Sequence, residues 1–204
     1  MSYAVFEIKR AVMEDVEEIW RMCMELATYE SRQHETTISE EDLRRNGFGE
    51  NPIFQCVVVK MAPKHGSSGK PATVGYSLYF YSYDTINGRS ITMDSIYVMP
   101  EFRNNGIGKA LLKRVAETAA QNNCSSVCFY VYNRNKSAMA FYQSIGAQDV
   151  TISQKINCYV LDGGAMEALI KSPRGSGSSS QASPVFMTPA VDEHPILLCG
   201  PSPC

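Results

Sequence analysis

The sequence lacks the features that define several large classes of protein. Its seven cysteines are an odd number and include no pair in C-x-x-C spacing, so we expect reduced thiols and no metal site, rather than a disulfide framework. No apolar run approaches the length of a membrane-spanning helix, and residues 1–4 lack the basic and apolar regions of a signal peptide. A net charge of −2 argues against nucleic acid or an anionic membrane as a partner. Together these absences favour a cytoplasmic location.

The chain is long enough for one domain with an appendage. Of its 204 residues, 44% are hydrophobic, which is ample for a buried core. From Ser172 onward Ser, Pro and Gly dominate the composition, and such a segment buries too little apolar surface to offset the entropy of ordering it. We therefore predict a folded domain over residues 1–171 and a disordered tail over residues 172–204.

Apolar periodicity within residues 1–171 predicts alternating strands and helices. Strands are predicted at residues 6–10, 54–61, 74–83, 91–99, 127–132 and, as one or two strands, 150–161. Helices are predicted at residues 13–29, 39–46, after Lys109, at 137–145 and at 164–171. The Asn87-Gly88 pair indicates a hairpin turn, and the alternation of strand and helix after it requires a crossover connection. The predicted fold class is α/β, with a mixed, mostly antiparallel central sheet flanked by helices on both faces.

One glycine-bearing turn stands between a predicted strand and a predicted helix. Its sequence at residues 103–109 is R-N-N-G-I-G-K, and backbone N–H groups at such a helix start converge on a phosphate. A P-loop requires a glycine where Arg103 stands and a Ser or Thr after Lys109, where there is an alanine. A dinucleotide fingerprint requires a third glycine where Leu111 stands. Both alternatives fail, which leaves another kind of phosphate loop or an ordinary helix-capping turn.

Short segments along nearly the whole predicted domain carry a family resemblance. They read L-A-T-Y-E at 26–30, G-F-G-E-N-P at 47–52, Y-D at 83–84, Y-V-M-P-E-F-R at 97–103, C-S-S at 124–126, N-K-S-A-M-A-F-Y at 135–142 and G-A at 146–147. In order and spacing they resemble the GNAT superfamily of N-acetyltransferases, and within it the spermidine/spermine (diamine) acetyltransferases, including their thialysine-acetylating branch. The resemblance implies acetyl-CoA as the cosubstrate, bound through the pyrophosphate loop R-x-x-G-x-G. The enzymes that the chain resembles are homodimers, so a homodimer is expected.

The resemblance assigns catalytic roles to Tyr142 and Asp94. Tyr142 matches the catalytic tyrosine near the acetyl-CoA sulfur, and a phenol pKa of about 10 suits proton donation to a thiolate whose conjugate acid titrates near about 8.5. A core aromatic is the alternative. Asp94 is the candidate base, because burial among apolar strand residues would raise its pKa. The family usually has the longer Glu at this position, which favours a water relay here, and a structural carboxylate is the alternative.

The resemblance also assigns coenzyme contacts. They fall on a strand whose backbone would pair with the pantetheine arm and supply an oxyanion donor, on the phosphate loop, and on the start of the later helix. The residues are Ile96, Tyr97, Val98, Arg103, Asn104, Asn105, Gly106, Ile107, Gly108, Lys109, Asn135 and Ser137. The family usually has Gly at the position of Asn104, and Asn tolerates positive φ better than most residues. Asn135 is equally suited to capping a helix.

The predicted substrate contacts are Tyr29, Glu30 and Asp84, because a carboxylate and a phenol ring suit an alkylammonium group. A solvated helix end is the alternative for the first two. The chain departs from the polyamine enzymes, since it has no indole near the hairpin and neither an acidic residue nor a Trp at residues 154–156. Long polyamines gain from several spaced carboxylates, so these departures favour a short amine or a lysine analogue.

The sequence therefore predicts an acetyl-CoA-dependent N-acetyltransferase that acts on a primary amine of a small molecule: a diamine, a polyamine or a thialysine-like lysine analogue. Two alternatives stay open. One is a GNAT enzyme that acetylates a protein N-terminus or lysine, and the other is a non-catalytic module that binds acetyl-CoA.

Overall fold

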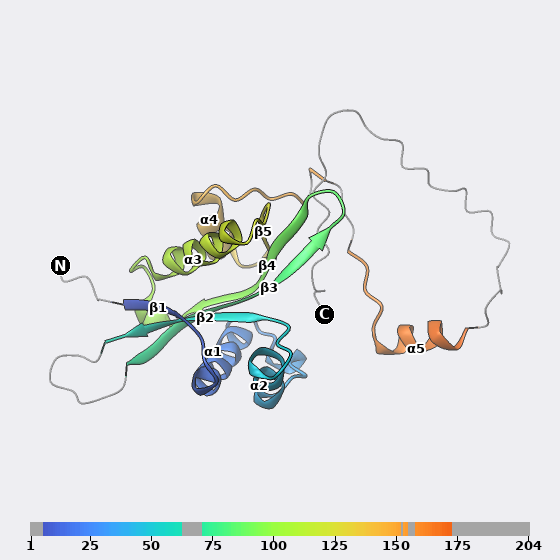
Figure 1. The fold of residues 1–204 in the computed structure, drawn as a ribbon, viewed down its shortest axis with the longest axis horizontal. Helices are drawn as coiled ribbons and strands as arrows, with labels where there is room; N and C mark the ends of the chain where they lie inside the picture. The colour runs from blue at the N-terminus through green and yellow to red at the C-terminus, as the bar shows by residue number, and fades with distance from the viewer. Residues whose placement is uncertain (1–5, 63–70, 152, 155–157, 173–204) are drawn as a thin grey trace. The chain divides into compact units, whose positions relative to one another are not determined.

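The computed structural model describes residues 6–62, 71–151, 153–154 and 158–172 (Figure 1). Its contacts divide the described chain into two compact units, residues 6–148 and residues 149–172. The predicted disorder of the tail concerns residues that, apart from Ser172, lie outside the described ones. No helix in the described part of the chain is both long and apolar enough to cross a membrane.

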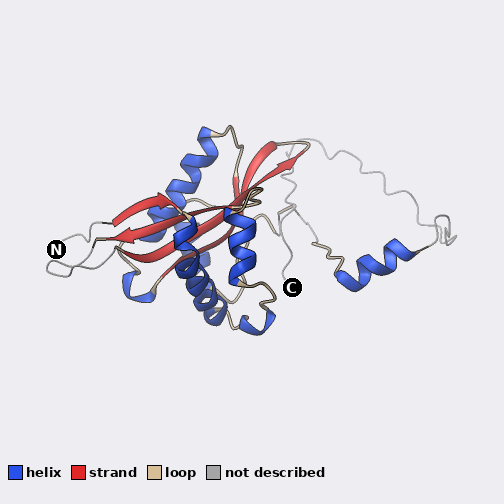
Figure 2. Cartoon of the chain, turned by 60° about the horizontal axis from the view of Figure 1, so that its bottom comes forward, coloured by secondary structure: helices blue, strands red, loops and turns tan. Residues whose placement is uncertain are grey.

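The first unit is built on one five-stranded sheet, drawn in red in Figure 2. The strands follow one another across the sheet in chain order: β1 (Phe6–Arg10), β2 (Gln55–Met61), β3 (Ala72–Asp84), β4 (Gly88–Val98) and β5 (Val127–Phe129). The first four are antiparallel to their neighbours, and β5 is parallel to β4. The predicted mixed, mostly antiparallel sheet is confirmed. β5 is shorter than the predicted strand at 127–132.

Helices cover both faces of this sheet (Figure 1). They are α1 (Val16–Tyr29) and α2 (Glu40–Phe48) on one face, and α3 (Ile107–Gln121) and α4 (Lys136–Ser144) on the other. Short 3-10 turns stand at Met13–Asp15, Gln33–Glu35 and Pro100–Phe102. The first of these replaces the start of the predicted 13–29 helix, because the Asp15 carboxylate accepts a hydrogen bond from the backbone N–H of Val12.

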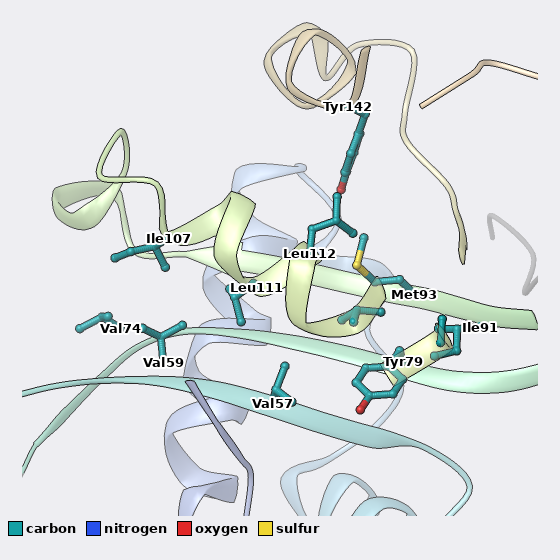
Figure 3. Close-up of a cluster of buried hydrophobic side chains, with 12 residues drawn as sticks. Val57, Val59, Val74, Tyr79, Ile91, Met93, Ile107, Leu111, Leu112 and Tyr142 are labelled. Carbon is teal, nitrogen blue, oxygen red and sulfur yellow. The ribbon is translucent and has the colours of Figure 1, made fainter. Parts of the chain in front are cut away.

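Alternation along the strands divides the core between the two faces. On β2, Val57 and Val59 belong to the cluster beneath α3 and α4, whereas Cys56 and Val58 belong to the cluster beneath α1 and α2. Figure 3 shows the first cluster, where Leu111 of α3 and Tyr142 of α4 point toward the sheet. Side chains on every second residue thus hold both helical layers to one sheet, which fixes the positions of the ends of α1, α3 and α4.

The prediction of strands at residues 150–161, in the second unit, is wrong. The described residues of that range form no strand; residues 152 and 155–157 lie outside the description. The backbone N–H of Thr151 bonds to the Asp149 carboxylate, and the N–H of Gln154 bonds to the carbonyl of Val150. Such local bonds compete with a sheet ladder. The unit ends in the predicted helix, α5 (Gly163–Lys171), capped by Asp162.

Candidate active site

The strands β4 and β5 separate after a short paired stretch. They pair over only Ile91 to Met93 of β4, so from Asp94 onward this edge of β4 has no strand partner among the described residues. On the other edge, Met93 lies opposite Tyr79 and Ser95 opposite Leu78, which leaves Asp94 as an extra residue. Asp94 is therefore a β-bulge, a feature that redirects side chains next to functional sites. The sequence prediction did not include this bulge.

The separated part of β4 turns backbone groups away from β3. The N–H of Met99 bonds to the carbonyl of Val74, so this residue directs its backbone toward β3. Successive residues of a strand direct their backbone groups to opposite sides, which turns those of Ile96 and Val98 away from β3. In agreement, the Val98 carbonyl accepts a hydrogen bond of 2.8 Å from Arg103 Nε. An extended ligand chain could pair with this edge in the way that a peptide adds to a sheet.

The turn before α3 leaves its helix start open. Asn104 has φ of 62° and Gly106 has φ of 78°, so the asparagine adopts the positive φ for which the sequence analysis allowed. Gly106 is the N-cap residue and supplies no side-chain cap. The next three backbone N–H groups, up to Lys109, have no acceptor within the helix, and the first turn carries no acidic residue. These features make an anion-binding site.

The space in front of that helix start is available to a ligand. A Cβ atom built at Gly108 would meet only the Phe141 ring, at 3.9 Å. The absence of a side chain at Gly108 therefore leaves space beside the backbone that no other part of the protein fills. Lys109 is exposed beside it and can add positive charge.

Two side chains of the loop contact other groups of the protein. The Arg103 guanidinium carbon lies 5.3 Å from the ring centre of Tyr29 and 5.4 Å from that of Tyr97. The Asn105 amide donates to the carbonyls of Phe102 and Arg103, at 3.2 and 3.1 Å. In this conformation the loop's donors toward a phosphate are its backbone N–H groups and Lys109, and Arg103 joins the end of α1 to the end of β4.

Tyr142 reaches from α4 into the hydrophobic cluster beneath α3 and α4 (Figure 3). Its ring is 8% exposed and lies 4.2 Å from that of Phe129 and 5.3 Å from that of Phe141, centre to centre. Burial raises the pKa of Tyr142 to about 12, and the nearby charge of Glu30 adds to this effect. The residue is thus a packed core aromatic, and its phenol is also kept fully protonated at neutral pH. These two properties do not exclude one another.

The carboxyl group of Glu30 interacts electrostatically with both Tyr142 and Asp94. Burial raises the pKa of Glu30; Arg32 and Arg134 oppose this, and Asp94 adds to it. Burial also raises the pKa of Asp94, against a hydrogen bond with Ser95 and the charge of Arg32. The sequence predicted a buried Asp94, but its side chain is open to solvent, because the bulge turns it out of the core. A substrate can therefore approach the Asp94 carboxyl group from its solvent-exposed side. The protein packed around its other sides raises its pKa.

Two arginines near these carboxylates were missed by the sequence analysis. Arg32 and Arg134 each place their guanidinium carbon 4.9 Å from the ring centre of Tyr132. Arg134 also donates to the backbone carbonyl of Glu30. The only sequence signal was proximity: Arg32 follows Glu30 closely, and Arg134 precedes the predicted cap at Asn135.

Three predicted contact residues have local structural roles or lie apart. Asp84 accepts hydrogen bonds from the backbone N–H groups of Ile86 and Asn87, at 2.8 and 2.6 Å, which lower its pKa and hold the hairpin turn. It stands opposite Gly88, roughly 20 Å along β4 from Asp94 at about 3.4 Å per residue. Asn135 caps α4 by accepting from the N–H of Ala138. Ser137 is exposed on the first turn of that helix.

A groove of about 950 Å³ runs along α1 and past the end of β4. Its lining includes three predicted contact residues, Tyr29, Tyr97 and Arg103. It also includes five glutamates and one further arginine: Glu17, Glu18, Glu25, Glu40, Glu101 and Arg21. The Tyr97 hydroxyl donates to Glu25 at 3.1 Å. Several predicted contact residues therefore border one concave and mainly acidic surface.

The chain is similar to known acetyltransferases in sequence. It matches the Acetyltransferase (GNAT) family over residues 13–147. It is 43% identical to the thialysine N-epsilon-acetyltransferase of Mus musculus over 162 residues, which are 79% of this chain and 95% of the mouse protein. It is 34% identical to the spermidine/spermine N(1)-acetyltransferase-like protein 1 of Homo sapiens over 150 residues, which are 74% of this chain and 21% of the human protein.

Solved structures share the fold. An integron cassette protein from the mobile metagenome of V. cholerae superimposes with a TM-score of 0.63 at 24% identity, over 82% of this chain and 98% of that one. An aminoglycoside N-acetyltransferase in complex with CoA superimposes with a TM-score of 0.57 at 13% identity, over 78% and 94% of the two chains. At these identities the likeness concerns the arrangement of helices and strands.

Proposed function

Because the chain belongs to the GNAT family of acetyltransferases, we propose that it transfers the acetyl group of acetyl-CoA to a primary amine of a small molecule, a diamine, a polyamine or a lysine analogue such as thialysine. One observation carries this proposal. The separated edge of β4, the uncapped start of α3, and Glu30 with the two groups that it interacts with, Tyr142 and Asp94, all belong to one unit of the fold.

The residues fit the coenzyme that GNAT acetyltransferases use. The open N–H groups at the start of α3 would hold the pyrophosphate, with Gly108 leaving room for its approach. The outward backbone of Ile96 and Val98 would hold the extended pantetheine arm. Acetyl-CoA supplies a thioester whose acetyl carbon accepts an amine and whose sulfur leaves as a thiolate.

Glu30 and Asp94 would receive the amine. Burial raises the pKa of both carboxyl groups, and in their ionised form they can bind an ammonium group. The amine must lose a proton before its lone pair can attack. Asp94 is short, and we propose that a water molecule relays that proton to it.

Tyr142 would complete the proton balance. As the new bond forms between the amine nitrogen and the acetyl carbon, the bond from that carbon to sulfur breaks, and the phenol donates its proton toward the sulfur. A pKa of about 12 keeps the proton on Tyr142 until the thiolate forms. A thiolate in the same dry environment is also a stronger base than in water.

An amine panel tests the proposal. The purified chain is given acetyl-CoA and thialysine, short diamines, spermidine, spermine, lysine peptides and N-terminal peptides, and thiol release is followed. We expect kcat/KM for thialysine or a short diamine to match or exceed that for spermine. Preference for a peptide would support the protein-acetylating alternative. Acetyl-CoA binding without turnover of any amine would support the non-catalytic one.

Assembly, cellular location and domain limits belong to the proposal as well. We propose a cytoplasmic homodimer whose acetyltransferase domain spans residues 1–171. In support, the enzymes that the chain resembles are homodimers. Light scattering coupled to size exclusion would decide between one and two copies.

A further inference from the structure

Two arginines and a tyrosine form a stack beside the proposed amine site. We call Arg32, Tyr132 and Arg134 the arginine stack, since each guanidinium carbon lies 4.9 Å from the centre of the tyrosine ring. Arg32 follows α1, and Arg134 directly precedes the cap residue of α4. The stack therefore connects segments that are about a hundred residues apart in the sequence.

The two arginines differ in their partners. Arg32 Nε pairs with Glu35 at 2.6 Å. Arg134 is exposed and donates to the backbone carbonyl of Glu30. In the described part of the chain, no carboxylate lies within ion-pair distance of Arg134. A guanidinium carries five N–H donors in a planar fork that matches a carboxylate, so Arg134 keeps donors that an incoming carboxylate could use.

Charges of both signs surround the site. Glu30, Asp94 and Glu35, the partner of Arg32, provide three negative charges, and Arg32 and Arg134 provide two positive charges that act on the same Glu30 carboxyl group. A long polycation gains less from such a mixed site than from carboxylates alone, because each arginine repels an ammonium group. A substrate that carries an ammonium at one end and a carboxylate at the other can pair with both kinds of charge.

We propose that the arginine stack, through Arg134 above all, binds the carboxylate of an amino-acid substrate whose side-chain amine is acetylated. This inference rests on the proposed function and narrows its substrate to amines of the lysine type. The amine end would lie between Glu30 and Asp94, facing Tyr142. The carboxylate end would lie on the guanidinium of Arg134, whose plane Tyr132 holds in place.

A matched pair of substrates separates the carboxylate from the amine. Thialysine and bis(2-aminoethyl) sulfide share the aminoethyl sulfide group, and only thialysine has the carboxylate. We expect Arg134→Gln to lower kcat/KM for thialysine about tenfold or more, the scale of a charged hydrogen bond, while kcat/KM for the sulfide diamine stays the same or rises. Lys136→Gln, an exposed neighbouring cation, should leave both values unchanged.

The possible failures are distinguishable. If Arg134→Gln lowers kcat/KM equally for both substrates, Arg134 only supports Glu30. The inference is then overturned, although the proposed function stands. If the parent enzyme prefers the sulfide diamine and the variant does not change that preference, the inference is overturned as well. If the parent acetylates neither substrate nor any other amine, the proposed function itself fails. Thermal melting of each variant separates these outcomes from misfolding.

Discussion

At the scale of single residues, Tyr142 joins packing and chemistry in one side chain. Tyr142→Phe keeps the ring that packs on Phe129 and Phe141 and removes only the hydroxyl. We predict that kcat falls about 10²-fold or more, the usual contribution of general acid catalysis, while affinity for acetyl-CoA stays near that of the parent. Steady-state kinetics and titration calorimetry measure the two quantities. A kcat within about threefold of the parent would reduce Tyr142 to a packing residue.

The pH dependence of the reaction follows from the same residue. The attacking amine is a weak base with a pKa of about 10, so kcat/KM should rise from about pH 7 to about pH 9 as more of the amine loses its proton. Tyr142, with a pKa of about 12, keeps its proton over that range. We therefore predict no descending limb below about pH 10. A maximum near neutrality would assign the proton donor to another group.

At the scale of elements, the start of α3 carries the coenzyme prediction. Gly108→Val adds a side chain in front of the open N–H groups, where the protein has only Phe141 at ordinary contact distance. The fold should persist, and acetyl-CoA affinity should fall about tenfold or more, or about 1.4 kcal/mol. Titration calorimetry tests this, with Gly163→Val as the control, since that helical glycine also borders open space. Unchanged affinity in a folded Gly108→Val variant would remove the loop from the coenzyme site.

A buried ion pair joins the segment before α1 to β2. Lys60 contacts Asp15, which is only 5% exposed, and donates to the Thr73 hydroxyl at 2.7 Å. Lys60→Met leaves that carboxylate buried without its cation, so the free energy of unfolding should fall by about 3 kcal/mol. Lys9→Met breaks only the exposed pair with Glu7 and should change the free energy of unfolding by less than about 0.5 kcal/mol. Equal effects of the two substitutions in urea unfolding would contradict this role.

At the scale of the whole molecule, residues 172–204 are predicted to be dispensable. The family match ends at residue 147, and the described helix α5 ends at Lys171. A protein that ends at Lys171 should keep the melting temperature and the kcat of the full chain, because a tail rich in Ser, Pro and Gly adds little burial. A loss in either quantity would assign the tail a contact with the folded part.

The sequence by itself determined the features that depend on nearby residues. The order of strands and helices through residue 147 followed from periodicity, and the hairpin turn at Asn87-Gly88 and the tolerance of Asn104 for positive φ followed from residue type. The phosphate loop was visible as a turn between a strand and a helix. Each of these depends on hydrogen bonds and side-chain spacing within a few positions along the chain, so a sequence pattern reports them.

Only the tertiary structure decided which distant groups meet. The bulge at Asp94 results from the register between β3 and β4, and the arginine stack results from the segment after α1 meeting the segment before α4. The position of Arg103 between Tyr29 and Tyr97 has the same origin. No local rule specifies them, because strand register and helix packing bring together residues many positions apart. The site is assembled by those long-range contacts, and its preference among amines depends on them too.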